Sequence, residues 1–232
     1  MDLANKLVNL IFVEIVVMKR ILLSLLIFCL SCDISSSKPI DNINPVNTVD
    51  IQNFDNMSRA YFASGCFWCV EAIYESIKGV KEVYSGYAGG KTKYPTYKQI
   101  GTGLTNHSES VEIIYDKSII NFKTLVEVFF GSHDPTTINR QGPDYGSQYR
   151  SIAFYSNENE KEIIENHIIE LKKNKIYKSQ IVTEVKALKI FYYGEEYHQD
   201  YKKKNPNNPY VKAVSIPRLN RFKNKYPYLL KN

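Results

Sequence analysis

Apolar residues recur with two different spacings from residue 59 to the end of the chain. In the segment 108–115 they alternate with polar residues, which predicts a half-buried strand. Val70, Ile73, Tyr74 and Ile77 are three or four residues apart and fall on one face of a helix. By these patterns we expect strands at 59–63, 80–87, 108–115, 150–155, 181–185 and 188–193. We expect helices at 66–77, 121–131, 157–173, 195–204 and 218–230.

The order of these elements, roughly β-α-β-β-α-β-α-β-α, predicts an α+β fold. We expect a two-layer sandwich with a ferredoxin-like core, in which helices pack on a mostly antiparallel or mixed sheet. Asn121 or Ser118, and Asn157, are the predicted helix N-caps. With 232 residues, 44% of them hydrophobic, the chain can build this core without disulfide staples.

The first 58 residues have a different character. From Met18, a possible start, the sequence runs through Lys19-Arg20 and an apolar stretch to Ser31-Cys32, which is the plan of a signal peptide. It resembles a bacterial lipoprotein leader with Cys32 as the lipid-bearing residue, although Cys29 stands where leucine is usual. An uncleaved N-terminal anchor is the alternative. We therefore expect a leader at 1–32, a flexible tether at 33–58 and a catalytic domain at 59–232.

This leader predicts a lipid-anchored protein on the extracytoplasmic side of the cell envelope, with the cytoplasm as the alternative. The net charge is +6, and from Asp200 onward nine Lys and Arg residues stand against one acidic residue. No nucleic-acid-binding motif accompanies them, so we expect a solvated basic face and no nucleic-acid partner.

The segment Gly65-Cys66-Phe67-Trp68-Cys69 joins a predicted strand to a predicted helix. A thiol at a helix N-terminus lies beside free N–H groups and the positive end of the dipole, which favours a thiolate at Cys66. Cys69 is one helical turn further on, near enough to form a disulfide with an oxidised Cys66. Two buried cysteines in a core helix are the structural alternative.

Three chemistries remain open at this pair. Half of a zinc site is disfavoured because the other cysteines lie in the leader and the four histidines are scattered, so we expect no metal. Hydrolysis would need His107, His133 or His198 as a base for Cys66. Redox chemistry explains the second cysteine best.

A thiol that attacks an oxidised sulfur would need an apolar socket and a proton donor. Candidates for these roles are Phe67, Trp68, Glu109, Tyr97, Asp144 and Tyr149.

Several motifs stand in order along residues 59–205. They are 65–71 (GCFWCVE), 86–90 (GYAGG), 95–97 (PTY), 107–111 (HSESV), 133–136 (HDPT), 140–150 (RQGPDYGSQYR) and 195–199 (EEYHQ). Together they resemble the peptide methionine sulfoxide reductase A family. The resemblance implies reduction of methionine S-sulfoxide, free or in proteins, without a bound cofactor.

The resemblance also implies residue roles. Cys66 would attack the sulfoxide sulfur and become a sulfenic acid, while Phe67 and Trp68 would hold the substrate methyl group. Glu109 would protonate the sulfoxide oxygen with help from Tyr97 and Tyr149. Asp144 would orient the site.

Many members of this family carry recycling cysteines near the C-terminus, but this chain has none after Cys69. Either Cys69 resolves the sulfenic acid, with reduction by a thioredoxin-like dithiol, or an external thiol attacks Cys66 directly. We favour the first. A disulfide exchanger and a non-catalytic module that binds oxidised methionine are the rival functions. We expect a monomer.

Overall fold

The computed structural model describes residues 57–231. The predicted leader, Cys32 and most of the predicted tether lie outside these residues. The last two tether positions, Met57 and Ser58, belong to the first strand, so the folded domain begins slightly before the predicted position 59.

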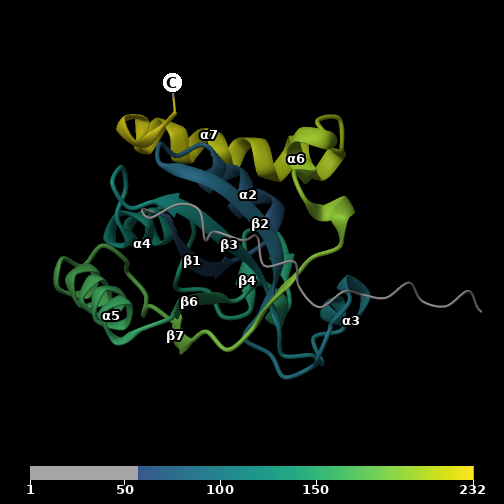
Figure 1. The fold of residues 1–232 in the computed structure, drawn as a ribbon, viewed down its shortest axis with the longest axis horizontal. Coiled ribbons are helices and arrows are strands. Elements are labelled where there is room, and N and C mark those ends of the chain that lie inside the picture. Colours follow the sequence, from purple (N-terminus) through teal and green to yellow (C-terminus); the bar gives the residue numbers. More distant parts are fainter. Residues whose placement is uncertain (1–56, 232) are drawn as a thin grey trace, which may run out of the picture. The chain divides into compact units, whose positions relative to one another are not determined.

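The domain is built on one six-stranded sheet with the strand order β7-β6-β1-β3-β2-β8 (Figure 1). Neighbouring strands are antiparallel except for β6 and β7, which are parallel. The strands are β1 (Met57–Ser64), β2 (Val80–Ala88), β3 (Ser108–Asp116), β6 (Ser151–Tyr155), β7 (Glu184–Ala187) and β8 (Phe191–Tyr193). This mixed sheet with helices packed on it confirms the predicted α+β fold class.

The main helices follow the apolar periodicity of the sequence. They are α2 (Phe67–Glu75), α4 (Phe122–Gly131), α5 (Glu158–Lys173) and α7 (Ile216–Lys225). The predicted caps at Asn121 and Asn157 are present, because each side chain accepts a hydrogen bond from a backbone N–H three residues on. In the part of the chain described, no helix is both long and apolar enough to cross a bilayer.

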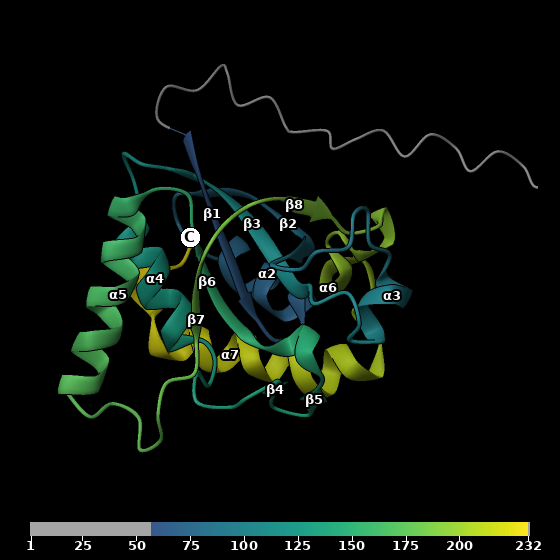
Figure 2. The same cartoon turned by 90° about the horizontal axis from the view of Figure 1, so that it is seen from below.

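The two faces of the sheet are covered differently. Odd-numbered residues of β3, such as Val111 and Ile113, contribute to the large core beneath α2 and α4. The opposite face carries a smaller cluster around Tyr61, Phe154 and Phe191. Figure 2 shows the helices gathered around the central strands, with α5 at the side of the sheet that contains β6 and β7.

Strand β3 is more buried than its alternating pattern predicts. All of its residues except Asp116 are buried, including the polar Glu109 and Glu112 on opposite faces. The prediction of a half-buried strand is therefore wrong, because tertiary packing covers both faces of this central strand.

Two stretches between the predicted strands and helices contain short elements of their own. The loop at 91–106 includes α3 (Tyr97–Gly101), which Thr96 and Gln99 begin with reciprocal capping bonds. The loop at 132–149 folds into a hairpin of β4 (Arg140–Gln141) and β5 (Asp144–Tyr145). A 3₁₀ turn, Ser147–Tyr149, follows the hairpin.

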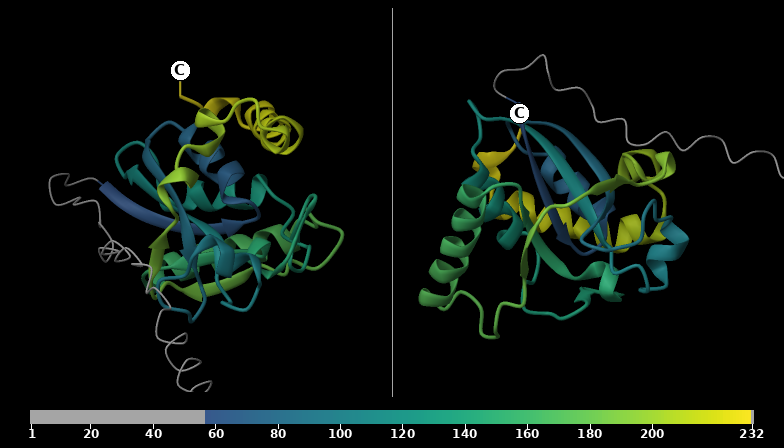
Figure 3. Two further views of the ribbon diagram at one scale, coloured as in Figure 1. Left: turned by 90° about the vertical axis from the view of Figure 1, so that its right-hand side faces the viewer. Right: turned by 60° about the horizontal axis from the view of Figure 1, so that its bottom comes forward.

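The C-terminal part of the chain also differs from the prediction. The expected helix at 195–204 is divided into a 3₁₀ turn (Glu196–His198) and α6 (Tyr201–Lys204), because Asp200 takes a left-handed backbone with φ 55°. The last helix starts before the predicted residue 218, as a π-helical turn (Val211–Ser215) that continues into α7. This C-terminal segment packs against α2, as Figure 3 shows in yellow.

Candidate active site

The site is built around the first turn of α2. Gly65 connects β1 to this turn with φ +91°, and a Cβ at this position would lie 2.6 Å from the side chain of Gln141. Glycine is therefore required here both by conformation and by space. Cys66 follows at the N-cap position, where its carbonyl accepts the first bonds of the helix from Cys69 and Val70.

Cys66 and Cys69 are both buried free thiols, and their pKa values move in opposite directions. Burial, with the neighbouring Cys69 and Glu109, raises the pKa of the Cys66 thiol. The pKa of Cys69 is lowered to about 6 by its hydrogen bond with Cys66, against the effect of burial, with help from Arg218 and Ser215. Of the two thiols, Cys69 is the one whose surroundings, with Ser215 at 2.9 Å and the charge of Arg218, favour the thiolate. The predicted lowering of the Cys66 pKa is wrong, because burial raises this pKa and outweighs the helix N-terminus.

Glu109 lies beside the first turn of α2. Its carboxylate oxygen accepts a hydrogen bond of 3.1 Å from the backbone N–H of Phe67. The side chain is only 2% exposed, and burial raises its pKa to about 8, with a further contribution from the charge of Asp144. A carboxyl with this pKa keeps its proton near neutral pH and can donate it.

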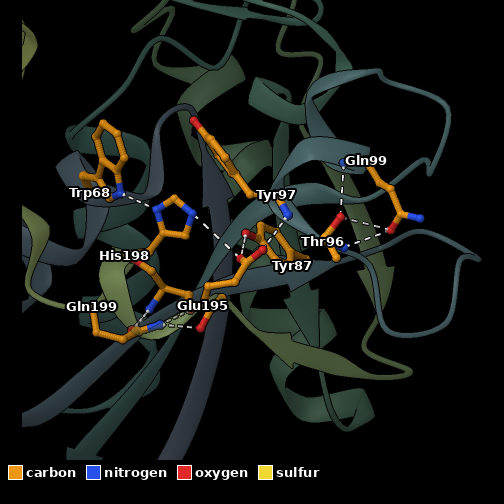
Figure 4. Close-up of polar contacts among 10 residues, drawn as sticks. Trp68, Tyr87, Thr96, Tyr97, Gln99, Glu195, His198 and Gln199 are labelled. Carbon is orange, nitrogen blue, oxygen red and sulfur yellow. Dashed lines mark hydrogen bonds and ion pairs between the residues drawn. The ribbon is translucent and has the colours of Figure 1, made fainter. Parts of the chain in front are cut away.

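Aromatic rings form one wall of the site. Phe67 is fully buried, whereas Trp68 is partly exposed and stacks on Tyr201 at a centroid distance of 3.7 Å. The indole N–H of Trp68 donates to Nδ1 of the buried His198 at 3.1 Å (Figure 4). One face of the indole is covered by Tyr201 and its N–H is bonded to His198, so these two contacts fix the orientation of the ring.

Tyr97 is held in the same wall by its backbone. Its N–H donates to Glu195 at 2.9 Å, and the other Glu195 oxygen accepts from the Tyr87 hydroxyl at 2.7 Å (Figure 4). The ring of Tyr97 lies 6.1 Å from that of Phe67 in a nearly parallel stack. Burial and the nearby Glu109 raise the pKa of both Tyr97 and Tyr149, so both phenols stay protonated and can donate hydrogen bonds.

Asp144 enters the site from the β4–β5 hairpin. It accepts a hydrogen bond of 2.7 Å from the hydroxyl of Tyr210, and burial raises its pKa. The same hydroxyl lies 4.0 Å from the sulfur of Cys69. Asp144 is thus connected through Tyr210 to the cysteine pair.

The structure brings all the predicted site residues of the domain into one region around Cys66. Sequence reasoning missed Tyr210, Ser215 and Arg218, which come from the C-terminal segment. No motif marks these three residues, since each is an ordinary residue type in a basic stretch. Glu195 and His198 stood in a noted motif, but only the fold shows that they support Tyr97 and Trp68.

The histidines have other partners. His107 bonds to the backbone of Gly90 and Thr92, and His133 to Phe129 and Ser151. Neither these two nor His198 forms a hydrogen bond with Cys66 among residues 57–231, so the structure gives no support to a Cys-His hydrolase. Within the same residues, no three His, Cys, Asp or Glu side chains are arranged to hold a metal ion.

The arrangement can therefore perform thiol redox chemistry. A thiol lies beside a protonated carboxyl and two phenols, next to an aromatic wall, and a second thiol with a low pKa is within hydrogen-bond contact. These parts allow nucleophilic attack, protonation of a leaving oxygen and formation of a disulfide.

Comparisons with known proteins agree with this chemistry. The family model "Peptide methionine sulfoxide reductase" matches residues 58–229. A peptide methionine sulfoxide reductase MsrA of Acinetobacter baumannii is 46% identical over 176 residues, which are 76% of this chain and 100% of the relative. The MsrA of Nautilia profundicola is 47% identical over 72% of this chain and 94% of its own length.

Solved structures show the same relationship. Methionine sulfoxide reductase A of Corynebacterium diphtheriae superposes with a TM-score of 0.60 at 34% identity, covering 68% of this chain and 79% of its own. Reduced Mxr1 from Saccharomyces cerevisiae gives a TM-score of 0.61 at 33% identity, covering 67% and 90%. The chain belongs to the peptide methionine sulfoxide reductase family.

Proposed function

We propose that this protein reduces methionine S-sulfoxide, free or in polypeptides, to methionine with electrons from thiols. The observation that carries this proposal is the position of the Cys66 thiol beside Glu109, a carboxyl whose pKa of about 8 keeps it protonated near neutral pH. The likeness of the motifs to A-type enzymes supports the S epimer.

The first half of the reaction transfers one oxygen atom. Glu109, Tyr97 and Tyr149 donate hydrogen bonds to the sulfoxide oxygen, which makes the sulfur more electrophilic. The sulfur of Cys66 attacks, the substrate S–O bond breaks, and the oxygen ends as a sulfenic acid on Cys66. The substrate sulfur gains two electrons and Cys66 loses two, while the thiol proton reappears on the sulfenic acid.

The aromatic wall supplies the socket for the substrate methyl group. Trp68 presents a partly exposed ring that His198 and Tyr201 hold in place, with Phe67 buried behind it. A preoriented ring loses little entropy when an apolar group packs on it.

The second half returns Cys66 to the thiol. Cys69 attacks the sulfenic acid, a Cys66–Cys69 disulfide forms, and water leaves. A thioredoxin-like dithiol then reduces the disulfide. The interaction between the two thiols, which lie one helical turn apart, supports this route over attack by an external thiol.

The test is methionine formation from the separate sulfoxide epimers with dithiothreitol as reductant. We expect methionine from the S epimer alone and none from the Cys66→Ser variant. Absence of product from both epimers would refute the proposal. A disulfide exchanger would instead reduce insulin and leave both sulfoxides unchanged.

We also propose that the protein acts in the cell envelope as a lipid-anchored enzyme. The support is the sequence of residues 18–32, which ends in Ser31-Cys32. Mass spectrometry of the mature N-terminus is the test. An acylated N-terminal Cys32 is expected, whereas an unmodified chain that begins before Cys32 would contradict the anchor.

A further inference from the structure

Arg218 is a buried cation whose hydrogen bonds go to backbone carbonyls. It is 9% exposed, and its guanidinium donates to two backbone carbonyls, Ser132 at 3.1 Å and Ser64 at 2.9 Å. Among residues 57–231 it forms no ion pair with Asp or Glu. A buried charge is costly without an opposite charge nearby, and the positive charge of Arg218 acts on two ionisable groups of this region, the carboxyl of Asp144 and the thiol of Cys69.

The sulfur of Cys69 lies against the stretch of chain that carries Arg218. The positive charge of Arg218 acts on Cys69, and the hydroxyl of the buried Ser215 lies 2.9 Å from the sulfur. Ser215 and Arg218 are one helical turn apart where the π-helical turn continues into α7, so the same stretch of backbone places both groups. Hydrogen bonds and a cation are the two features that stabilise a thiolate.

We propose that Ser215 and Arg218 are positioning residues that hold the sulfur of Cys69 as a thiolate, and that recycling of Cys66 depends on them. This inference rests on the proposed function, in which Cys69 resolves the sulfenic acid. The C-terminal segment, which carries no cysteine, would then contribute to recycling through a serine and an arginine.

The other groups around Cys69 do not cancel this effect. Cys66 at the N-cap of α2 and Tyr210 on the C-terminal segment lower the pKa of Cys69 through hydrogen bonds. Glu109 on β3 would oppose a thiolate at Cys69 if ionised, and an ionised Asp144 on β5 would compete with Cys69 for the charge of Arg218. Burial raises the pKa of both carboxyls, which weakens their opposition.

A thiolate at Cys69 serves two successive steps. It first attacks the sulfur of the Cys66 sulfenic acid, so that an S–S bond forms, the S–O bond breaks, and the departing hydroxide takes up a proton to become water. A dithiol reductant then attacks the sulfur of Cys66, and Cys69 leaves as the thiolate. The second thiol of the reductant then attacks the reductant's own sulfur in the mixed disulfide and displaces Cys66, so the dithiol becomes a disulfide and the cysteine pair gains two electrons. A leaving thiol of low pKa departs faster, which favours this direction of attack.

The experiment measures the ionisation of Cys69 directly. The full-length chain carries Cys29→Ser, Cys32→Ser and Cys66→Ser, so that Cys69 is its sole thiol, and the ultraviolet absorbance of the thiolate is followed against pH. We expect Arg218→Gln to raise the midpoint by about one pH unit, with alkylation by iodoacetamide below the midpoint slowed about tenfold.

Two further variants separate charge from structure. Arg218→Lys keeps the charge and should restore most of the shift, and Ser215→Ala should raise the midpoint by less than Arg218→Gln. Arg221→Gln is the matched control, because Arg221 lies on the same helix one turn further on and is exposed. It should leave the midpoint unchanged. If circular dichroism shows that Arg218→Gln does not fold, the midpoints of Ser215→Ala and Arg218→Lys decide whether the inference stands.

Unchanged midpoints in folded Arg218→Gln and Ser215→Ala would overturn the inference. Turnover is measured separately, with Cys66 retained and only Cys29→Ser and Cys32→Ser in the background. If Arg218→Gln shifts the midpoint but leaves thioredoxin-coupled turnover undiminished in this background, the inference is also overturned. A different result would show that Cys69 does not resolve the sulfenic acid. In that case the Cys69→Ser variant would regenerate the Cys66 thiol with a dithiol at the rate of the parent protein, whatever midpoint Cys69 shows in the other variants.

Discussion

The two faces of β3 each bury a glutamate, and the two glutamates have very different surroundings. Glu109 and Glu112 are each 2% exposed. Glu112, on the face opposite to the helices, accepts from the hydroxyls of Tyr61, at 2.6 Å, and Tyr193, and pairs with Arg59 at 3.3 Å. Glu109 receives one backbone hydrogen bond, from Phe67, and no cation lies within ion-pair distance of it among the described residues.

This difference separates a structural carboxyl from a reactive one. Glu112 has the two hydrogen-bond donors and the cation that a buried carboxylate requires for stability. Glu109 lacks the cation, so burial dominates and its pKa rises to about 8. The glutamate with fewer polar partners, Glu109, is therefore the one that can release a proton to a substrate.

The largest expected effect is on the rate of oxygen transfer. Glu109→Gln removes the acidic proton but keeps the size of the side chain, and we expect the single-turnover rate to fall about a hundredfold or more. Glu112→Gln is the matched control and should retain the rate per folded molecule to within about twofold. The measurement is methionine formed in one turnover without reductant. Full single-turnover activity of Glu109→Gln would remove this residue from the mechanism.

The pH profile should separate the same two residues. Since Glu109 must be protonated, the single-turnover rate should decline as the pH rises through about 8, by roughly tenfold per unit well above that value. The Glu112→Gln variant should follow the same profile, while the residual rate of Glu109→Gln should lack this decline. An unaltered decline in Glu109→Gln would assign the titration to another group.

The substitutions Glu109→Gln and Glu112→Gln should change the free energy of unfolding in opposite directions. The pKa of Glu109 rises from 4.5 to about 8 on folding, so the folded state binds more protons than the unfolded state between these values. The free energy of unfolding therefore loses a contribution of a few kcal/mol as pH rises through this window. Glu109→Gln should be more stable than the parent at pH 8, by a margin that shrinks towards pH 5.

Glu112→Gln should instead be less stable, by about 1–3 kcal/mol, because partners selected for a carboxylate lose part of their bonding. Denaturant unfolding at both pH values measures both variants. Equal destabilisation by the two substitutions at pH 8 would contradict the distinction between the two faces.

The smallest effects should come from removing one hydroxyl on each face. Tyr87→Phe removes a donor to Glu195, which holds the backbone of Tyr97, and Tyr193→Phe removes a donor to Glu112. Each should cost about 1 kcal/mol of stability. Only Tyr87→Phe should also raise KM for the sulfoxide by a few-fold. Equal KM values for both variants would show that Glu195 does not position Tyr97 for binding.

Much of the domain could be predicted because local patterns specify it. The spacing of apolar residues in α2 and α4 and the caps at Asn121 and Asn157 are properties of short segments. The segment from Gly65 to Cys69 likewise specifies its own strand-to-helix turn, since glycine alone tolerates the backbone at position 65.

Other features depend on contacts between distant segments. The burial of both faces of β3 and the break at Asp200 follow from packing that no local pattern encodes. The order of the two thiol pKa values is a stronger example. The sequence places Cys66 at a helix N-terminus, which favours a thiolate there, but burial and the neighbouring groups reverse this order.

The sequence alone determined the family, the fold class and the two cysteines, because these depend on residue types at short and recognisable spacings. Only the tertiary structure decided that Ser215 contacts Cys69, and that the charge of Arg218 acts on it, from nearly 150 residues further along the chain. Electrostatic interactions depend on distance in space and on burial, and neither quantity can be read from the position of a residue in the chain.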